Sequence, residues 1–136
     1  MHGSVIARDS DRDLAILRVD RALSSPPERA LEPFLDIPKA GDGVVAFGFP
    51  EGVDEIQVSA GKMRGRDSFY NDQIVLNATQ ACTFGSSGSI QVRADGRWWG
   101  IQQSIGPHYE CTSLSAIDVV ELIQKIPGWE HYPQKH

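Results

Sequence analysis

The sequence predicts an all-β domain of short antiparallel strands, built as a barrel or a sandwich and followed by one helix. From Val44 onward, short apolar runs alternate with turn signals rich in Gly, Pro and Asp, which is typical of antiparallel barrels and sandwiches. Asp95-Gly96 separates two such runs and is a strong hairpin signal, since both residues tolerate positive φ. Only the apolar residues after Ser115 follow a period near 3.6, and a Pro-Gly pair ends that helical run.

The elements follow in chain order. Residues 14–19, LAILRV, form an aliphatic run too short for a globular helix and are predicted to be a buried strand. Residues 21–39 contain four prolines, which exclude a long helix or a central strand and predict a surface connection. Further strands are expected at residues 44–49, 55–63, 73–79, 90–94 and 98–105.

Composition narrows the class of protein. The 136 residues are 40% hydrophobic and 23% charged, values typical of one folded globular domain. The net charge of −5 excludes the basic surface that nucleic acids require, so no nucleic-acid partner is expected. No apolar run approaches the roughly 20 residues of a membrane span. The cellular compartment stays open.

The cysteines and histidines do not predict a metal site. Cys82 and Cys111 lack metal-ligand spacing with the four histidines. The two cysteines could form one disulfide or remain two buried thiols.

The segment TFGSSGSI, residues 83–90, is the most informative stretch. A Gly and Ser cluster between strands is, taken alone, more often a turn without function. A functional turn would instead point the backbone N–H groups of Gly85 and Ser87 at one point, where they could stabilise the oxyanion formed when Ser87 attacks a carbonyl. The nucleophile elbow of α/β-hydrolases does not fit, because Ser89 replaces its second glycine and a strand follows.

Asp13 stands at the start of the strand in the segment DRDLAILRV. Such an acidic residue is, in isolation, more often a solvated turn residue. In a catalytic triad, however, an aspartate must be fixed and partly buried so that it orients an imidazole. The buried strand that follows Asp13 would provide that anchor.

These motifs occur in a telling order. The segment DRDLAIL is followed by GVVAFGFPEG and then by GSSGS, with 74 residues between Asp13 and Ser87. From about Ser4 to Ile126, the chain resembles trypsin-like serine peptidases of the chymotrypsin fold, especially the HtrA type. The resemblance implies a Greek-key barrel at 41–117, preceded at 1–40 by remnant strands of a first barrel and a connecting segment, and followed at 118–136 by a helix and tail.

The resemblance also implies an activity. Ser87 would be the nucleophile and Asp13 the triad aspartate of a serine endopeptidase acting on polypeptides, with oxyanion donors at Gly85 and Ser87 and with no cofactor or metal. Ser86 and Ser89 depart slightly from the family pattern. The larger departure is the histidine, which the family places several tens of residues before the aspartate, whereas this chain begins 12 residues before Asp13.

The histidine-bearing segment is therefore expected to be missing, and the chain alone to be inactive. None of the chain's own histidines is expected to replace it: His2, His108, His131 and His136. The alternatives are an inactive, protease-like module that binds peptides, and a subunit that receives its histidine from another chain. The expected partners are a polypeptide substrate and either the missing N-terminal segment or another chain.

The specificity pocket is also read from the resemblance. Ala81 would form its floor, Cys82 would lie beside it, and Thr112 would lie near the opposite wall. The strand that pairs with the substrate backbone would contain Gln103, Ser104 and Ile105. A floor without an acidic residue predicts that the substrate residue before the cut is uncharged and small to medium in size. Cys82 and Cys111 lie near the place where secreted relatives have a disulfide.

Overall fold

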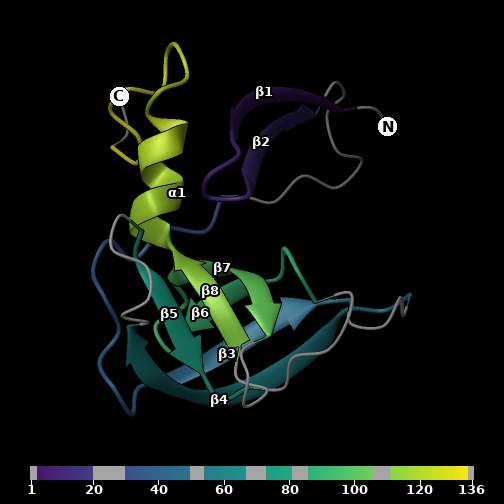
Figure 1. Cartoon of the computed structure of the whole chain (residues 1–136), viewed down its shortest axis with the longest axis vertical. Coiled ribbons are helices and arrows are strands. Elements are labelled where there is room, and N and C mark those ends of the chain that lie inside the picture. The colour runs from purple at the N-terminus through teal and green to yellow at the C-terminus, as the bar shows by residue number, and fades with distance from the viewer. Residues whose placement is uncertain are drawn as a thin grey trace.

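The chain folds into a two-stranded sheet, a six-stranded barrel and a helix (Figure 1). The computed structural model describes residues 3–19, 30–49, 54–66, 73–80, 86–105 and 111–134. The small sheet pairs β1 (Gly3–Asp9) with β2 (Leu14–Val19), which is the strand predicted at 14–19 but is half-buried to exposed instead of buried. The barrel contains β3 (Gly43–Gly48), β4 (Gln57–Arg66), β5 (Val75–Ala78), β6 (Ile90–Arg93), β7 (Trp98–Ile105) and β8 (Cys111–Ser115). Helix α1 (Ala116–Ile123) follows directly.

The barrel is antiparallel throughout and closes in the order β3-β4-β5-β8-β7-β6. Neighbours such as β5 and β8 are not consecutive in sequence, as in Greek-key connections. The predicted all-β fold, with an antiparallel barrel and one C-terminal helix, is therefore confirmed. Among the described residues, no helix has the length and apolar character needed to cross a membrane.

Two hydrophobic clusters hold these parts together. The first lies within the barrel strands and is formed by Val44, Met63, Leu76, Ala78 and Trp99. The second joins β7 and β8 to the helix and is formed by Val75, Trp98, Leu114, Ala116, Val119 and Val120, with Leu14 of β2 packed against it. The second cluster fixes the β1–β2 hairpin and the helix at the same end of the barrel (Figure 1).

Strand β8 was not recognised in the sequence. All five of its residues are buried, yet three of them carry hydroxyl groups, so the strand lacks the apolar run that reveals a buried strand. Protein partners satisfy some of these groups: Thr112 Oγ1 donates to Asn77 Oδ1 over 3.1 Å. The Ser115 side chain accepts from the backbone N–H of Asp118 and caps helix α1.

The hairpin between β6 and β7 is present, but its turn differs from the expected two-residue form. Gly96 has a φ of 85°, whereas Asp95 does not have a positive φ. The backbone N–H of Gly96 donates to Arg93 O over 3.0 Å, and that of Arg93 donates to Arg97 O over 2.9 Å. This three-residue loop needs one left-handed residue instead of two. Hydrogen bonds from the Arg97 side chain and backbone lower the pKa of the Asp95 carboxyl group.

The described part of the proline-rich connection is more closely packed than expected. Pro33 and Pro38 are buried. The N–H of Phe34 donates to Trp98 O over 2.8 Å, and the N–H of Trp98 donates to Glu32 O over 3.0 Å. These bonds dock the connection onto the start of β7. Residues 20–29 lie outside the described residues.

Candidate active site

Ser87 lies at the exposed tip of a turn that is fastened to β7. The N–H of Ser89 donates to Ser86 O over 3.0 Å and closes the turn, and Gly88 adopts a φ of 88°. Gly88 N–H donates to Gln102 O over 2.8 Å, and Gln102 N–H donates to Ser89 O over 2.9 Å. The turn therefore presents the Ser87 side chain to solvent from a fixed backbone. Ser86 before it and Ser89 after Gly88 are buried.

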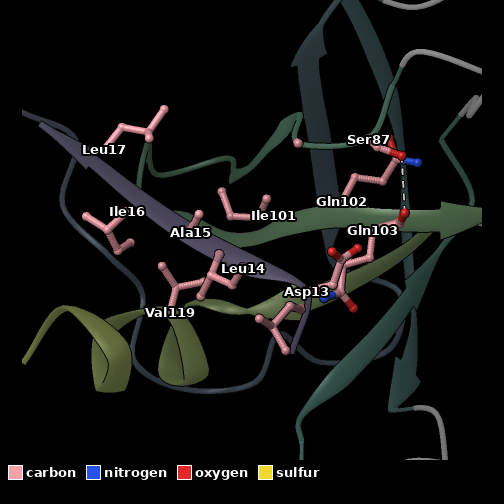
Figure 2. A pocket seen from close by; sticks show the side chains of 12 residues that line it. Asp13, Leu14, Ala15, Ile16, Leu17, Ser87, Ile101, Gln102, Gln103 and Val119 are labelled. Atoms are coloured by element: carbon pink, nitrogen blue, oxygen red, sulfur yellow. Dashed lines mark hydrogen bonds between the residues drawn. The ribbon is translucent and has the colours of Figure 1, made fainter. Parts of the chain in front are cut away.

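The Ser87 hydroxyl group is oriented by a backbone carbonyl. Ser87 Oγ donates to Gln103 O over 3.2 Å, and the two groups face each other in Figure 2. A peptide carbonyl accepts a hydrogen bond but is far too weak a base to remove the serine proton. The contact therefore orients the hydroxyl group and does not activate it, because activation requires an adjacent general base.

Asp13 occupies the last position of the turn between β1 and β2. It has a φ of 52°, which is uncommon for a residue with a side chain, and its N–H donates to Ser10 O over 3.3 Å. Asp13 is exposed, although the sequence predicted a partly buried residue. Its carboxylate makes no hydrogen bond to the residues that the structure describes. The Asp13 carboxylate can therefore accept a hydrogen bond from another group.

One cavity of about 540 Å³ is lined by both Asp13 and Ser87 (Figure 2). The aspartate comes from the hairpin and the serine from the barrel, 74 residues later in the chain. Apolar side chains of β2, β7 and helix α1, among them Leu14, Ile101 and Val119, form much of the wall between them. The fold therefore brings the predicted aspartate and the predicted nucleophile to the same cavity.

The other predicted site residues are only partly within the described structure. Gln103 lines the cavity, and the backbones of Ser104 and Ile105 pair with Thr112 and Cys111 of β8. Three predicted residues lie outside the described residues: Ala81, Cys82 and Gly85. Thr112 is buried. Cys111 is disulfide-bonded, and the sequence contains only one other cysteine.

Of the histidines, His131 is exposed in the segment after helix α1, and the other three lie outside the described residues. No cluster of three or more His, Cys, Asp and Glu side chains suited to a metal ion occurs among the described residues.

A second cavity, which the sequence does not predict, also reaches Ser87. It measures about 270 Å³ and is lined on one side by Ser87, Gly88 and Ser89. Phe47, Phe49 and Ile56 of the β3–β4 hairpin provide apolar surface on the other side. Phe49 and Ile56 are 50% and 57% exposed, respectively. The aromatic residues of the FGFP segment indicate an apolar surface in the sequence. Their closeness to Ser87 could not be predicted, because it depends on the pairing of β3 with β6.

Ser87 on its turn and Asp13 on its hairpin thus line one cavity beside an antiparallel barrel. Residues 1–101 match the sequence model of the trypsin-like peptidase domain, and the chain belongs to that family. No curated protein sequence matches the chain.

Solved structures of similar fold include several proteases. The active form of the Rv3671c protease from M. tuberculosis superposes with a TM-score of 0.75 at 23% identity, covering 92% of this chain and 58% of that one. The HtrA-type protease AlgW with a decapeptide gives 0.77 at 26% identity, covering 95% and 41%. The serine endoprotease from Yersinia pestis gives 0.76 at 21%, covering 90% and 43%. The chain thus spans about half the length of these proteins.

Proposed function

We propose that this chain is the part of a serine endopeptidase that carries the nucleophile and the aspartate, and that a histidine from outside these 136 residues completes it. The observation that carries the proposal is the cavity shared by Asp13 and Ser87. Because both residues line this cavity, an imidazole placed in it is the group expected to contact the carboxylate and the serine hydroxyl at once.

The proposed reaction is peptide-bond hydrolysis through an acyl-enzyme. The supplied imidazole accepts the proton of Ser87 as Oγ attacks the scissile carbonyl, and it then donates that proton to the leaving amine. Asp13 holds the imidazole in the correct tautomer and stabilises its protonated form. The backbone N–H groups of Gly85 and Ser87 stabilise the oxyanion. A water molecule then hydrolyses the acyl-enzyme and releases Ser87.

The unpaired backbone at the end of β7 favours the proposal that the substrate is a polypeptide. Strand β6 pairs with β7 only as far as Ile101, so the segment from Gln103 to Ile105 has no strand partner on that side among the described residues. An extended peptide can add there as a further strand. The family resemblance implies Ala81 at the pocket floor, and a floor without an acidic residue predicts that the residue before the cut is uncharged and small to medium in size.

The proposal is tested by adding a segment that carries the missing histidine. The purified chain is assayed for peptide hydrolysis and for labelling by an active-site phosphonate, alone and after addition of a histidine-bearing first-barrel segment from the parent reading frame. We expect no measurable turnover by the chain alone, and hydrolysis with labelling of Ser87 in the complex. In that complex, Ser87→Ala abolishes labelling, and Asp13→Asn lowers kcat by roughly 10⁴-fold.

Two results would contradict the proposal. Robust hydrolysis by the chain alone would mean that one of its own histidines is the base. Peptide binding by the complex without any serine-dependent hydrolysis would instead favour the inactive peptide-binding module.

A further inference from the structure

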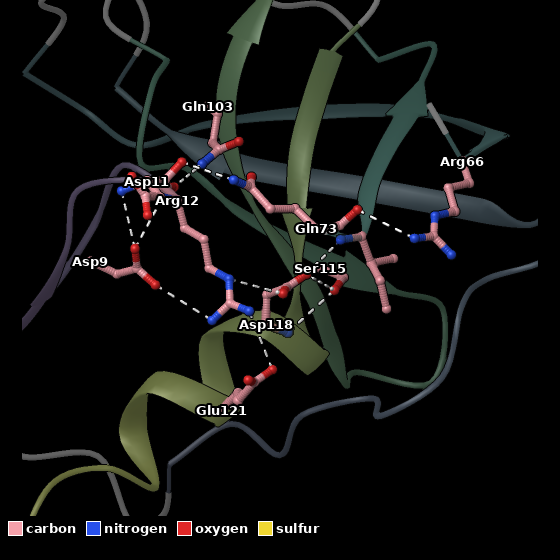
Figure 3. A network of polar contacts seen from close by, with 10 residues as sticks. Asp9, Asp11, Arg12, Arg66, Gln73, Gln103, Ser115, Asp118 and Glu121 are labelled. Carbon is pink, nitrogen blue, oxygen red and sulfur yellow. Dashed lines mark hydrogen bonds and ion pairs between the residues drawn. The ribbon is translucent and has the colours of Figure 1, made fainter. Parts of the chain in front are cut away.

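The barrel donates hydrogen bonds to the backbone carbonyls of the two residues that precede Asp13 in the turn (Figure 3). Gln73 Nε2 donates to Asp11 O over 2.8 Å. Gln103 Nε2 donates to Arg12 O. Gln73 lies in the segment before β5, and Gln103 lies in β7. Two separate parts of the barrel therefore donate hydrogen bonds to consecutive residues of the turn.

Arg12 adds an ionic anchor to helix α1. Its Nε lies 3.2 Å from Asp118 Oδ1, and its terminal nitrogens lie 3.4 Å from Asp9 and Glu121 carboxylate oxygens. The Arg12 and Asp118 side chains are only 14% and 4% exposed. Displacing a partner from a buried ion pair leaves an uncompensated charge, so this contact strongly opposes movement of Arg12.

Asp118 itself is fixed. Its Oδ2 accepts hydrogen bonds from Ile74 N–H over 2.7 Å and from Ser115 Oγ over 3.2 Å. The arginine therefore binds to a carboxylate that is already tied to the helix N-terminus and to the barrel. On the hairpin side, Asp9 Oδ1 accepts from the N–H groups of Asp11 and Arg12 over 3.1 and 3.2 Å.

Asp13 has no comparable hold of its own. Its carboxylate is without a hydrogen bond in the described part of the chain, and its φ of 52° lies in the left-handed region, which Asp adopts more readily than most residues with a side chain. The position of this carboxylate therefore depends on how the residues before it in the turn are held, together with the packing of Leu14 directly after it. Gln103 links the turn to the serine, because its side chain contacts Arg12 O and its own carbonyl accepts the Ser87 hydroxyl.

We propose that Arg12 is a positioning residue: its ion pair with Asp118 sets the place of the Asp13 carboxylate relative to Ser87. This inference rests on the proposed function for its catalytic meaning. A displacement of about 1 Å in a reacting group can cost about 10²-fold in rate, so a contact remote from the chemistry can control kcat.

The test compares Arg12→Met and Arg12→Lys with Arg97→Met in the complex with the histidine-bearing segment. Arg97 is a control for the loss of an exposed arginine ion pair, since it pairs with Asp95 over 2.8 Å in a hairpin turn away from the cavity. We expect Arg12→Met to lower kcat by roughly 10- to 100-fold with little change in KM. Arg12→Lys retains the charge and recovers part of the loss, and Arg97→Met behaves as the wild type.

The pH profile separates positioning from folding. An aspartate in place raises the pKa of the neighbouring imidazole, because it stabilises the charged form. A displaced Asp13 should therefore shift the acid limb of kcat/KM to lower pH in Arg12→Met. A fall in kcat without this shift would make Arg12 merely structural and would overturn the inference.

Hydrogen exchange on the chain alone makes the two proposals distinguishable. Arg12→Met should accelerate exchange in residues 10–14 while β7 stays protected, and Arg97→Met should not. Unchanged exchange in residues 10–14 would overturn the inference even if the complex is active. Accelerated exchange with no serine-dependent activity in the wild-type complex would support the hold on the turn and reject the proposed function.

Discussion

At the scale of single residues, the backbone conformation of Gly88 matters as much as the Ser87 side chain. Gly88 and Gly96 have φ values of 88° and 85°, and a Cβ built on either would meet nothing within 4 Å. Alanine would therefore introduce conformational strain without a steric clash. The two glycines differ in their distance from the predicted site: Gly88 follows the predicted nucleophile, whereas Gly96 lies in the β6–β7 turn.

We therefore predict that Gly88→Ala and Gly96→Ala each lower the free energy of unfolding by about 1–2 kcal/mol, because a left-handed conformation is unfavourable for an L-residue. Only Gly88→Ala should also reduce phosphonate labelling of Ser87 in the complex. Urea denaturation and labelling rates measure the two effects. Equal labelling by both variants would mean that the turn does not set the reactivity of Ser87.

At the scale of elements, close backbone contacts within the barrel depend on particular glycines. A Cβ on Gly61 of β4 would lie 2.2 Å from Gln80 N and 2.7 Å from Gln80 Cα. Both are backbone atoms, so a change of rotamer cannot relieve the clash.

We predict that Gly61→Ala destabilises the barrel by about 3 kcal/mol, at the upper end of overpacking effects. Thermal unfolding followed by near-ultraviolet circular dichroism measures the loss. Gly43→Ala is the matched control in the neighbouring strand, since its Cβ would meet nothing within 4 Å. A Gly61→Ala variant as stable as Gly43→Ala would show that β4 does not approach the segment after β5 this closely.

At the scale of the whole molecule, the β1–β2 sheet exposes apolar side chains. Val5, Leu17 and Val19 are 58%, 63% and 48% exposed, respectively. The sheet has only two strands, which is marginal for stability in water, and the outer edges of both strands are unpaired among the described residues. Such a surface favours association with another chain.

We predict that the chain by itself self-associates with rising concentration, and that Leu17→Ser weakens this association. Leu35→Ser is the control, because Leu35 is 47% exposed but lies in the connection rather than in the sheet. Sedimentation velocity measures both variants. Equal association of the two variants, or a monomer at every concentration, would show that the sheet is not the contact surface. Addition of the histidine-bearing segment should replace self-association with a defined complex.

The sequence determined the fold class, the trypsin-like family and most barrel strands, because alternation, turn residues and helical period are local properties of the chain. It did not reveal β8, since three of the five residues of this buried strand carry hydroxyl groups that find partners or burial only after folding. The sequence also singled out Asp13 and Ser87 as a pair, but only through the order of motifs.

The tertiary structure alone decided that these two residues line one cavity, because their approach depends on packing of the hairpin and helix α1 against β7 and β8. It alone paired Arg12 with Asp118, which lie more than 100 residues apart. Contacts of this kind leave no trace in local periodicity, since they arise from long-range topology and from the partners available to a buried charge.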